Sequence, residues 1–274
     1  LIVDCGIGFT NDLPGANVMV PDVSILKKIK NNIVGIILTH LHEDHIGAIQ
    51  YIWEDLRCPI YASRFTKAFL LEKLKEYSFF NQVEVIEANE GDRLDLKPFT
   101  VELISLTHST PEMNAILIKT EEGNILNTGD WKFDPKPILG AKSDVKRLKQ
   151  LGTRGEVLAT VCDSTNIFND GETTSENELY SSFYNIIKSR KGLVVCAMFA
   201  SNISRIKTLV DIAQKTNREV VLLGSSLFRV TKVARDVGYL DEKINFLNEP
   251  SVKNRKKRNL LVIATGCQGE TGAG

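Results

Sequence analysis

The stretch His40-Leu41-His42-Glu43-Asp44-His45 holds three of the four histidines in the chain, and it indicates the chemistry that the sequence predicts. Imidazole and carboxylate are ligands that suit zinc or manganese, and a site without thiolate ligands can keep one coordination position open for water. The fourth histidine, His108, is available as a further donor. The stretch therefore predicts a hydrolytic centre that binds two metal ions.

The segments on either side place this stretch at a junction between a strand and a helix. Residues 33–39 form a continuous apolar run that predicts a strand buried on both faces. The apolar residues that follow recur at spacings of three, four and three, as on one stripe of a helix, and they are Ile46, Ile49, Trp53 and Leu56. A loop between these elements can gather His40, His42, Asp44 and His45 around one point, whereas a regular strand would send neighbouring side chains to opposite faces.

Two further donors lie at the ends of predicted strands. His108 follows the alternating strand at residues 101–106, and Asp130 ends the segment at residues 124–130. Gly129 permits a close backbone approach, which would bring the Asp130 carboxylate near the histidines. We therefore expect His108 and Asp130 to complete the centre.

These motifs resemble those of the metallo-β-lactamase superfamily, which run Asp, His-x-His-x-Asp-His, His and Asp, each at a strand end. The corresponding residues here are Asp4, the stretch from His40 to His45, His108 and Asp130. The resemblance implies that His40, His42 and His108 bind one metal ion, that Asp44 and His45 bind a second, and that Asp130 bridges the two. It also implies that Asp4 supports the ligands without binding metal. From the residues alone, an Asp just ahead of a glycine is also a common turn residue, and both interpretations stay open.

The second half of the chain predicts a separate α/β domain. Residues 131–274 contain no histidine, whereas a superfamily member that acts on small molecules would be expected to supply one soon after Asp130. Predicted strands alternate with predicted helices, which indicates a parallel sheet wrapped by helices. The strands are expected at residues 157–161, 193–199, 219–223, 244–247 and 260–264, and the helices at residues 176–190, 202–216 and 226–237. This insertion resembles the β-CASP domain of metallo-β-lactamase nucleases.

Four motifs in order resemble the bacterial ribonuclease J family over essentially the whole chain. They lie at residues 129–135, 163–166, 199–205 and 265–270. The resemblance implies that Asp163 is the general acid and that Ser201 and Asn202 contact the nucleotide, roles that suit a carboxyl group and polar side chains. From the residues alone, Asp163 could instead belong to an ordinary turn, and Ser201 and Asn202 could cap the helix that follows.

The fold predicted is an incomplete metallo-β-lactamase αββα sandwich with an inserted β-CASP α/β domain whose sheet is mainly parallel. We expect the first part of the β-lactamase domain at residues 1–165, the β-CASP domain at residues 166–264, and the start of the return at residues 265–274. The chain opens inside an apolar strand without an initiator Met, which indicates a fragment. Because the family's final metal-ligand His and phosphate-binding loop would lie beyond residue 274, we expect the chain as given to be inactive.

Composition limits the partners. The 34 basic residues balance the 34 acidic ones, so no global field attracts a polyanion. The basic run at residues 253–258 could be a solvated loop or a phosphate contact. No apolar run reaches the roughly 20 residues that span a bilayer, and we expect no targeting signal from the first residues. The five cysteines are widely spaced and resemble reduced thiols, so we expect a cytoplasmic protein with no membrane partner.

The function predicted from the resemblance is a metal-dependent ribonuclease that acts as a 5′-3′ exonuclease and endonuclease in RNA processing and decay. Its cofactors would be two divalent metal ions, zinc first and manganese or magnesium as alternatives. Its partners would be RNA and further copies of itself in a dimer or tetramer. The alternatives are a hydrolase of small molecules built on the same fold, and a non-catalytic RNA-binding scaffold.

Overall fold

The computed structural model describes residues 1–10, 16–253 and 255–266. The chain divides into two compact units. Unit 1 comprises Leu1–His108, Glu112–Phe133 and Ser143–Asp170, and unit 2 comprises Ser109–Pro111, Asp134–Lys142 and Gly171–Gly274. The domain boundary after residue 165 that the sequence suggests stays a proposal, and most of the expected return segment, residues 267–274, lies outside the described residues.

The first sheet of unit 1 is fully parallel, and its strands lie in the order β1-β4-β5-β6. These strands are β1 (Ile2–Val3), β4 (Ile36–Ile37), β5 (Ile60–Ala62) and β6 (Val85–Glu87). Ile36 and Ile37 have no exposed surface, as the apolar run at residues 33–39 predicts for a strand covered on both faces. The pairing of β1 with β4 sets the ends of both strands side by side, so Asp4 and Thr39 come together.

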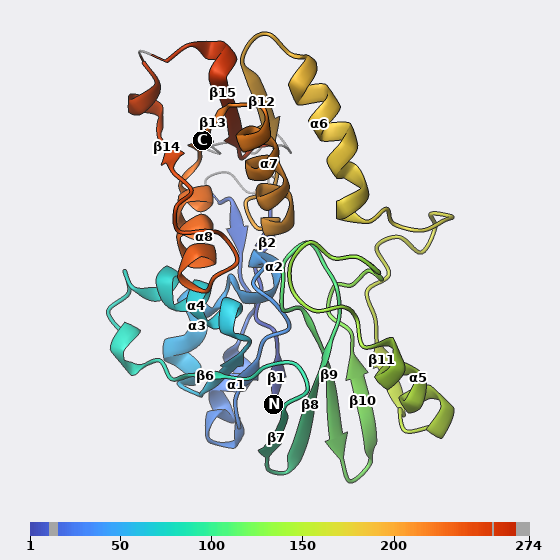
Figure 1. Ribbon diagram of the computed structural model, residues 1–274. Helices are drawn as coiled ribbons and strands as arrows, with labels where there is room; N and C mark the ends of the chain where they lie inside the picture. The colour runs from blue at the N-terminus through green and yellow to red at the C-terminus, as the bar shows by residue number, and fades with distance from the viewer. Residues whose placement is uncertain (11–15, 254, 267–274) are drawn as a thin grey trace. The chain divides into compact units, whose positions relative to one another are not determined.

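The second sheet of unit 1 has the order β11-β10-β9-β8-β7, with antiparallel pairs except between β10 and β11. Its strands are β7 (Arg93–Leu96), β8 (Phe99–Ser105), β9 (Asn114–Thr120), β10 (Gly123–Asn127) and β11 (Ala159–Val161). A small separate ribbon pairs β2 (Gly8–Phe9) with β3 (Val18–Met19). Figure 1 shows the long hairpins of the second sheet in green.

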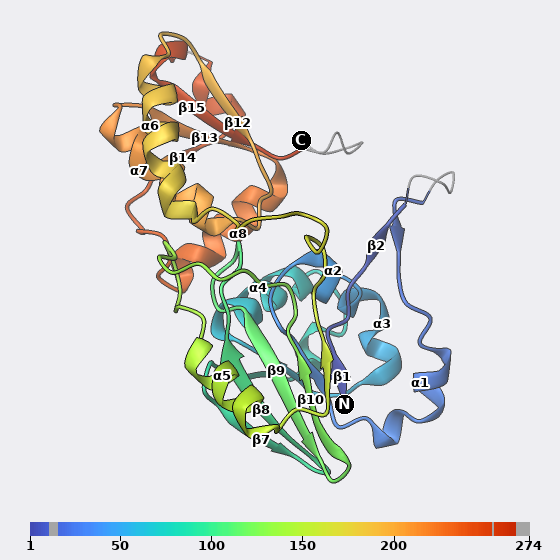
Figure 2. The same ribbon diagram turned by 90° about the vertical axis from the view of Figure 1, so that its right-hand side faces the viewer.

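The two sheets of unit 1 pack face to face with helices on their outer sides. Ile37 of β4 lies in one buried cluster with Val101, Leu103 and Ile116 of the second sheet. A second cluster on the other face of that sheet joins Ile104 to Leu151 of α5. The helices of unit 1 are α1 (Ser24–Lys28), η1 (Lys30–Asn32), α2 (Glu43–Ile46), α3 (Ile49–Leu56), α4 (Arg64–Leu74), η2 (Phe80–Gln82) and α5 (Val145–Arg154). This is the αββα sandwich that the sequence predicts, visible in Figure 2.

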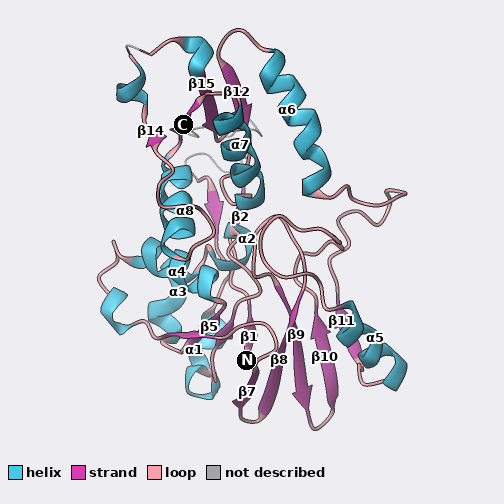
Figure 3. Cartoon of the chain, viewed as in Figure 1, coloured by secondary structure: helices cyan, strands magenta, loops and turns pink. Residues whose placement is uncertain are grey.

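Unit 2 is built on a parallel sheet with the strand order β12-β15-β13-β14. The strands are β12 (Val194–Ala197), β13 (Glu219–Leu223), β14 (Phe246–Leu247) and β15 (Leu260–Ala264). The helices are η3 (Glu176–Glu178), α6 (Leu179–Ser189), α7 (Ile203–Lys215), α8 (Ser225–Asp236), η4 (Glu249–Val252) and η5 (Lys257–Asn259). Strands and helices alternate along this part of the chain, as Figure 3 shows, and the predicted fold class is confirmed.

The structure differs from the predicted elements in one place that matters for the centre. The apolar stripe from Ile46 to Leu56 is buried as expected, but it spans two helices, α2 and α3, rather than one. The break falls at Gly47 and Ala48, where the Ala48 amide donates to the Cys5 carbonyl 2.9 Å away. This bond between segments overrides the regular helical repeat. None of the helices in the described residues combines the length and apolar character that crossing a membrane requires.

Helix α5 is held to the second sheet by an ion pair with a buried glutamate. Asp144 caps the start of the helix through a 2.9 Å bond from the Arg147 amide, and Gly155 ends it in the left-handed conformation. The Arg147 guanidinium donates to both carboxylate oxygens of buried Glu102 on β8, at 2.6 and 3.0 Å. The Arg147 hydrogen bond, joined by the charges of Arg147, Lys119 and Arg93, outweighs burial and lowers the pKa of Glu102 from its ordinary value of 4.5.

We expect Glu102→Gln to lower the free energy of unfolding of unit 1 by about 2–4 kcal/mol at pH 7, because the half-buried Arg147 guanidinium loses a bidentate carboxylate partner. Because the folded pKa of Glu102 is depressed, its contribution is present above pH 4.5 and is lost as the pH falls through the folded value. The difference between the variant and the parent should therefore shrink in acid. Both tryptophans, Trp53 and Trp131, lie in unit 1, so urea unfolding followed by tryptophan fluorescence measures this unit alone.

The control for this prediction is Glu121→Gln, which removes an exposed carboxylate from the turn between β9 and β10. It should leave the midpoint of unfolding near that of the parent across the same pH range. A stability difference for Glu102→Gln that stayed constant from neutral pH into acid would show that the charge of Glu102 does not stabilise the fold.

Candidate metal centre

The predicted ligand stretch begins just beyond β4 and runs into helix α2. His42 is the N-cap residue of α2 and has an extended backbone, with φ −64° and ψ 151°. Asp44 and His45 lie within the first turn of the helix. The expectation that all of these ligands occupy a loop is therefore wrong for the last two. The change from extended to helical backbone at His42 turns successive side chains toward one region.

The structure brings the predicted metal-binding side chains into two groups, both within unit 1. The first group contains His40, His42, His108 and Asp130, with one ligand atom of each lying within 4.8 Å of all the others. The second group contains Asp44, His45 and Asp130 under the same limit. Asp130 belongs to both groups, so its carboxylate lies where it can serve two ions at once. All six residues come from the ends of sheet strands or from α2.

Asp4 supports these groups through hydrogen bonds with Thr39 and His45. One carboxylate oxygen of Asp4 accepts from the Thr39 amide at 2.8 Å. Its other oxygen lies 2.8 Å from the Thr39 hydroxyl and 2.7 Å from Nδ1 of His45. Asp4 adopts a φ of 58°, in the left-handed region that few residues other than glycine occupy. A strained backbone is thus retained where it aims a carboxylate at a histidine.

This hydrogen-bond chain determines which nitrogen of His40 carries a proton. A carboxylate only accepts hydrogen bonds, so the Thr39 hydroxyl donates to Asp4. The hydroxyl oxygen then accepts from Nδ1 of His40, 2.9 Å away. The remaining nitrogen, Nε2, carries an unprotonated lone pair. His40 has no exposed surface, and its Nε2 atom is buried without a hydrogen-bond partner among the described residues.

A buried nitrogen without a hydrogen-bond partner costs folding free energy unless a ligand binds it, because burial removes its hydrogen bonds to water and supplies none in their place. A divalent cation is the partner that fits, since neutral imidazole and carboxylate groups surround the atom. The same carboxylate of Asp4 holds Nδ1 of His45, which directs the other nitrogen of His45 toward Asp130 at 3.3 Å. A carboxylate behind a histidine is the usual support for a metal ligand. The side chains present therefore fit divalent metal ions.

The pKa values of three histidines are lowered, whereas the pKa of His45, which contacts two carboxylates, is raised. Burial lowers the pKa of His40 well below its usual range, and burial with the neighbouring histidines lowers the pKa of His42 to about 3. Burial also lowers the pKa of His108. All three rings are neutral near pH 7 and can donate lone pairs.

His45 behaves differently in the absence of an ion. Burial would lower its pKa, but the hydrogen bonds and charges of Asp130 and Asp4 raise it to about 10. Service as a ligand would require loss of the proton on Nε2, so metal affinity at His45 should rise with pH.

Two glycines allow the backbone to pass close to the centre. A Cβ atom on Gly6 would lie 1.6 Å from the Asp44 carbonyl oxygen, so no other residue fits without moving α2. At Gly129, which has a φ of 54°, a Cβ atom would lie 2.5 Å from Cε of Met113 and 3.0 Å from Cβ of Thr39. Gly129 therefore permits the close approach that the sequence predicts for Asp130.

The sequence did not reveal an ion pair beside the ligands, in which the lysine is buried. Lys73 on α4 is only 6% exposed, and its ammonium group contacts the carboxylate of Glu43. Glu43 stands between His42 and Asp44, so the pair anchors the first turn of α2 to α4. Lys73 lies among apolar helix residues with no motif around it, which explains why sequence reasoning passed over it. Thr39 was missed as well, although a polar residue at the end of an apolar strand is a usable signal.

Asp163 lies in unit 1 after β11, near the centre. One carboxylate oxygen accepts from both the amide and the hydroxyl of Thr165, at 2.8 and 2.7 Å. The Asp163 amide donates to the Thr128 hydroxyl at 3.2 Å, which ties the turn to the end of β10. The charge of Asp163 is felt at His108, where it opposes the lowering of the pKa by burial. The turn that the sequence allows is present, and it orients the carboxyl group.

Ser201 and Asn202 lie in unit 2, at the carboxyl end of β12. The Asn202 side chain caps α7, with its oxygen accepting from the Arg205 amide at 2.9 Å. Both residues are half-buried. The capping role is thus observed. The cap uses the side-chain oxygen of Asn202 and does not use its side-chain NH2 group.

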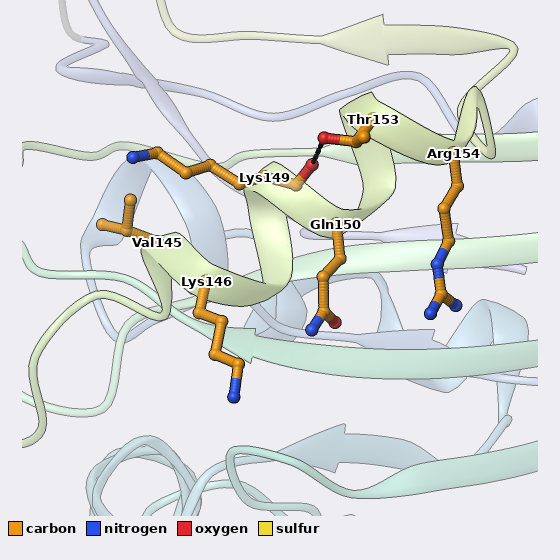
Figure 4. A pocket seen from close by; sticks show the side chains of 6 residues that line it. All are labelled: Val145, Lys146, Lys149, Gln150, Thr153 and Arg154. Atoms are coloured by element: carbon orange, nitrogen blue, oxygen red, sulfur yellow. Dashed lines mark hydrogen bonds between the residues drawn. The ribbon is translucent and has the colours of Figure 1, made fainter.

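A hollow of about 480 Å³ lies along α5, lined by Val145, Lys146, Lys149, Gln150, Thr153 and Arg154. Figure 4 shows the side chains of Lys146, Gln150 and Arg154 extending to one side of the helix, while the Thr153 hydroxyl bonds back to the Lys149 carbonyl. No lining residue is a histidine or a carboxylate. The hollow therefore has no part in the metal centre.

Two packed sheets between helices, with histidine and aspartate ligands gathered at strand ends, define a metallo-β-lactamase-type metal site. The chain belongs to the metallo-β-lactamase superfamily, whose family model matches residues 1–190. Residues 191–274 match the model described as ribonuclease J, beta-CASP domain. The resemblance predicted from the sequence motifs is confirmed.

Curated relatives agree with this assignment. The chain is 41% identical to ribonuclease J of Sinorhizobium meliloti over 271 residues, which cover 98% of this chain and 48% of that protein. It is 34% identical to ribonuclease J of Helicobacter pylori, covering 99% of this chain and 40% of that protein. It is 35% identical to ribonuclease J 1 of Streptococcus pyogenes, covering 99% of this chain and 48% of that protein. The chain spans about half the length of the curated relatives it matches.

A solved structure shares the fold. It is a protein of unknown function from Enterococcus faecalis, with a TM-score of 0.59 and 17% identity. The match covers 95% of this chain and 71% of that chain. At this identity the likeness concerns the fold alone.

We expect Thr39→Val to weaken zinc binding by about 10- to 100-fold, because Nδ1 of His40 loses its acceptor and Asp4 loses a donor. Thr39→Ser keeps the hydroxyl and is the matched control, with affinity near that of the parent. Competition for zinc against a chromophoric chelator measures both variants. Equal affinity of the Val and Ser variants would show that the hydroxyl does not position His40.

Proposed function

We propose that the protein is a metal-dependent ribonuclease that hydrolyses RNA phosphodiester bonds as a 5′-3′ exonuclease and endonuclease. The observation that carries the proposal is the buried, unpartnered Nε2 atom of His40 within a group of four ligand atoms that shares Asp130 with a second group. The match of residues 191–274 to a ribonuclease J domain supports RNA as the substrate. A small-molecule hydrolase would have no evident use for that domain.

In this proposal His40, His42 and His108 bind one divalent ion, and Asp44 and His45 bind a second. Asp130 is shared between them. Two such ions, when bound, supply an activated water and neutralise charge that develops on the phosphate. Superfamily membership and the ligand groups support divalent metal binding. We propose zinc as the metal because imidazole suits it, with manganese or magnesium as alternatives.

The remaining residues would position and transfer protons. Asp4 and Thr39 would hold His40 in the tautomer described above, and Asp4 would orient His45 through Nδ1, so Asp4 would support the ligands without binding metal. Asp44 and Asp130 would orient the attacking water by accepting hydrogen bonds from it. Asp163 would hold a proton on the oxygen not engaged by Thr165 and donate it to the leaving 3′ oxygen. Ser201 and Asn202 would contact the nucleotide through hydroxyl and amide groups.

The proposal extends to where the protein acts and with what. The described cysteines, Cys5, Cys58, Cys162 and Cys196, are all free thiols, as expected in a reducing compartment such as the cytoplasm. RNA processing and decay would take place there. Assembly into a dimer or tetramer is proposed from the family resemblance alone.

The dinuclear assignment is tested by metal analysis of the full-length protein purified with zinc. We expect two ions per chain, and we expect His42→Ala to lose at least one of them. RNA cleavage by His42→Ala should fall by about 1,000-fold or more, because metal ions supply several kcal/mol of stabilisation in the transition state. The exposed Asp170→Asn variant is the control and should keep both the ions and the rate. A folded, zinc-saturated parent that held one ion or none would refute the two-metal site.

The role of Asp163 is tested by comparing leaving groups. We expect Asp163→Asn to slow RNA cleavage by about 100- to 10,000-fold, the range for loss of a general acid, with unchanged metal content. A phosphodiester with a p-nitrophenolate leaving group needs no protonation, so the variant should cleave it at nearly the parental rate. Loss of metal, or an equal loss of rate on both substrates, would make Asp163 a ligand or a structural residue instead.

A further inference from the structure

Charge is divided unevenly along the chain, although the whole chain is neutral. Residues 171–274 contain 16 Lys and Arg against 10 Asp and Glu, and residues 1–170 contain 18 against 24. The second part therefore carries a net charge of +6 and the first a net charge of −6. The absence of a global field does not exclude a local one, which is what attracts a polyanion.

Five cations of unit 2 lie where its parallel strands begin. Arg190 and Lys191 lie in the loop between α6 and β12, and Lys256, Lys257 and Arg258 lie just ahead of β15. We call these five residues the basic edge. All five are exposed. Figures 1 and 2 both show the end of α6 and the red segment before β15 at the same end of the sheet.

Arg218 fixes the two segments of the basic edge beside each other. Its buried guanidinium, at the start of β13, donates to the carbonyl of Arg190 at 2.6 Å and to that of Gly192 at 2.9 Å. It also donates to the carbonyl of Leu260 at 2.9 Å. The Arg218 side chain thereby joins two basic segments that are far apart in the sequence, so both lie at the same end of the sheet.

The cations of the basic edge lack acidic partners. Within the part of the chain that the structure describes, none of the five forms an ion pair. The nearby carboxylate of Glu219, at the start of β13, is engaged by Arg255 instead. Clustered like charges without counter-charges repel each other, and the repulsion is relieved when an anion binds.

We propose that the basic edge is a second RNA-binding surface, which holds backbone phosphates of nucleotides outside the reacting segment; this inference rests on the proposed ribonuclease function. Strands β12, β13 and β15 have four or five residues, so the sheet is about 15 Å long. Ser201 and Asn202 follow the opposite end of β12. An RNA that touches both ends must extend over several nucleotides. The basic edge should therefore favour long RNA over short RNA without regard to sequence.

The test compares two triple variants of the full-length protein. Lys256→Gln, Lys257→Gln and Arg258→Gln neutralise the basic edge. The matched control, Lys146→Gln, Lys149→Gln and Arg154→Gln, neutralises three exposed cations on the α5 hollow shown in Figure 4. All six side chains lie at the surface or partly exposed, so both variants should fold, which circular dichroism checks. The probes are 5′-monophosphorylated oligouridylates of about 5 and about 30 nucleotides, with a site size of ~4–16 nucleotides as a guide.

We expect the edge variant to bind the long RNA roughly 50-fold more weakly near 0.15 M salt and to reduce the slope of log affinity against log salt by about 2. The KM for the long RNA should rise with little change in kcat. The short RNA and bis(p-nitrophenyl) phosphate should be cleaved as by the parent, and the α5 variant should match the parent throughout.

Other outcomes would overturn the inference. Equal losses in the edge and α5 variants would indicate a general charge effect and no site. Unchanged RNA affinity with lost binding of polyglutamate would assign the basic edge to an acidic protein. A parent that cleaved neither RNA nor bis(p-nitrophenyl) phosphate would contradict the ribonuclease function itself, whatever the binding results.

Discussion

The Asp4 carboxylate is the interaction on which the centre depends. It receives the amide and the hydroxyl of Thr39 and one nitrogen of His45, so three groups from the end of β4 and from α2 meet on it. Through Thr39 it also sets the protonation of His40, a residue with no exposed surface. Away from water an unsatisfied donor is costly, so the Thr39 hydroxyl donates to Asp4 and Nδ1 of His40 donates to Thr39. The lone pair of His40 Nε2 is positioned as a consequence, and the Nε2 atom of His45 is held toward Asp130.

The sandwich of unit 1 supplies the rigidity that this network needs. Ile37 and the apolar residues of the second sheet form one cluster directly beneath the ligand-bearing strand ends. Close-packed interiors resist small displacements, so the histidines stay close together. The backbone contact at Gly6 and the ion pair between Lys73 and Glu43 add two supports for α2. The fold thus holds ready a group of ligands that would not assemble in a flexible loop.

Unit 2 uses its parallel sheet differently at its two ends. Where the strands end, Ser201 and Asn202 precede α7 and provide short polar side chains. Where the strands begin, loops drawn together by Arg218 present cations. Parallel strands make this division natural, because every strand starts at one edge and ends at the other. One sheet can therefore carry two kinds of polar surface without disturbing its core.

Ligand type and periodicity were enough to predict much of this protein from its residues. The density of histidines around Asp44 predicted the metal site, and the apolar repeats predicted strands β13 and β15 with the observed bounds. These features are local, since they depend on side-chain chemistry and on a strand or helix repeat. The same reasoning left Asp163 undecided between a turn and a catalytic role, because both need the same residues.

The contacts between distant groups became visible only in the folded protein. The pairing of β1 with β4 brought Asp4 to Thr39 across 35 positions of sequence, and no local pattern contains that register. The bond from Ala48 to Cys5 broke the predicted helix, since a contact between segments outweighed the helical repeat. Arg218 joined loops whose positive charges look like separate solvated runs in the sequence. Hydrogen bonds between segments depend on the packed fold, and so their partners emerge only when it is complete.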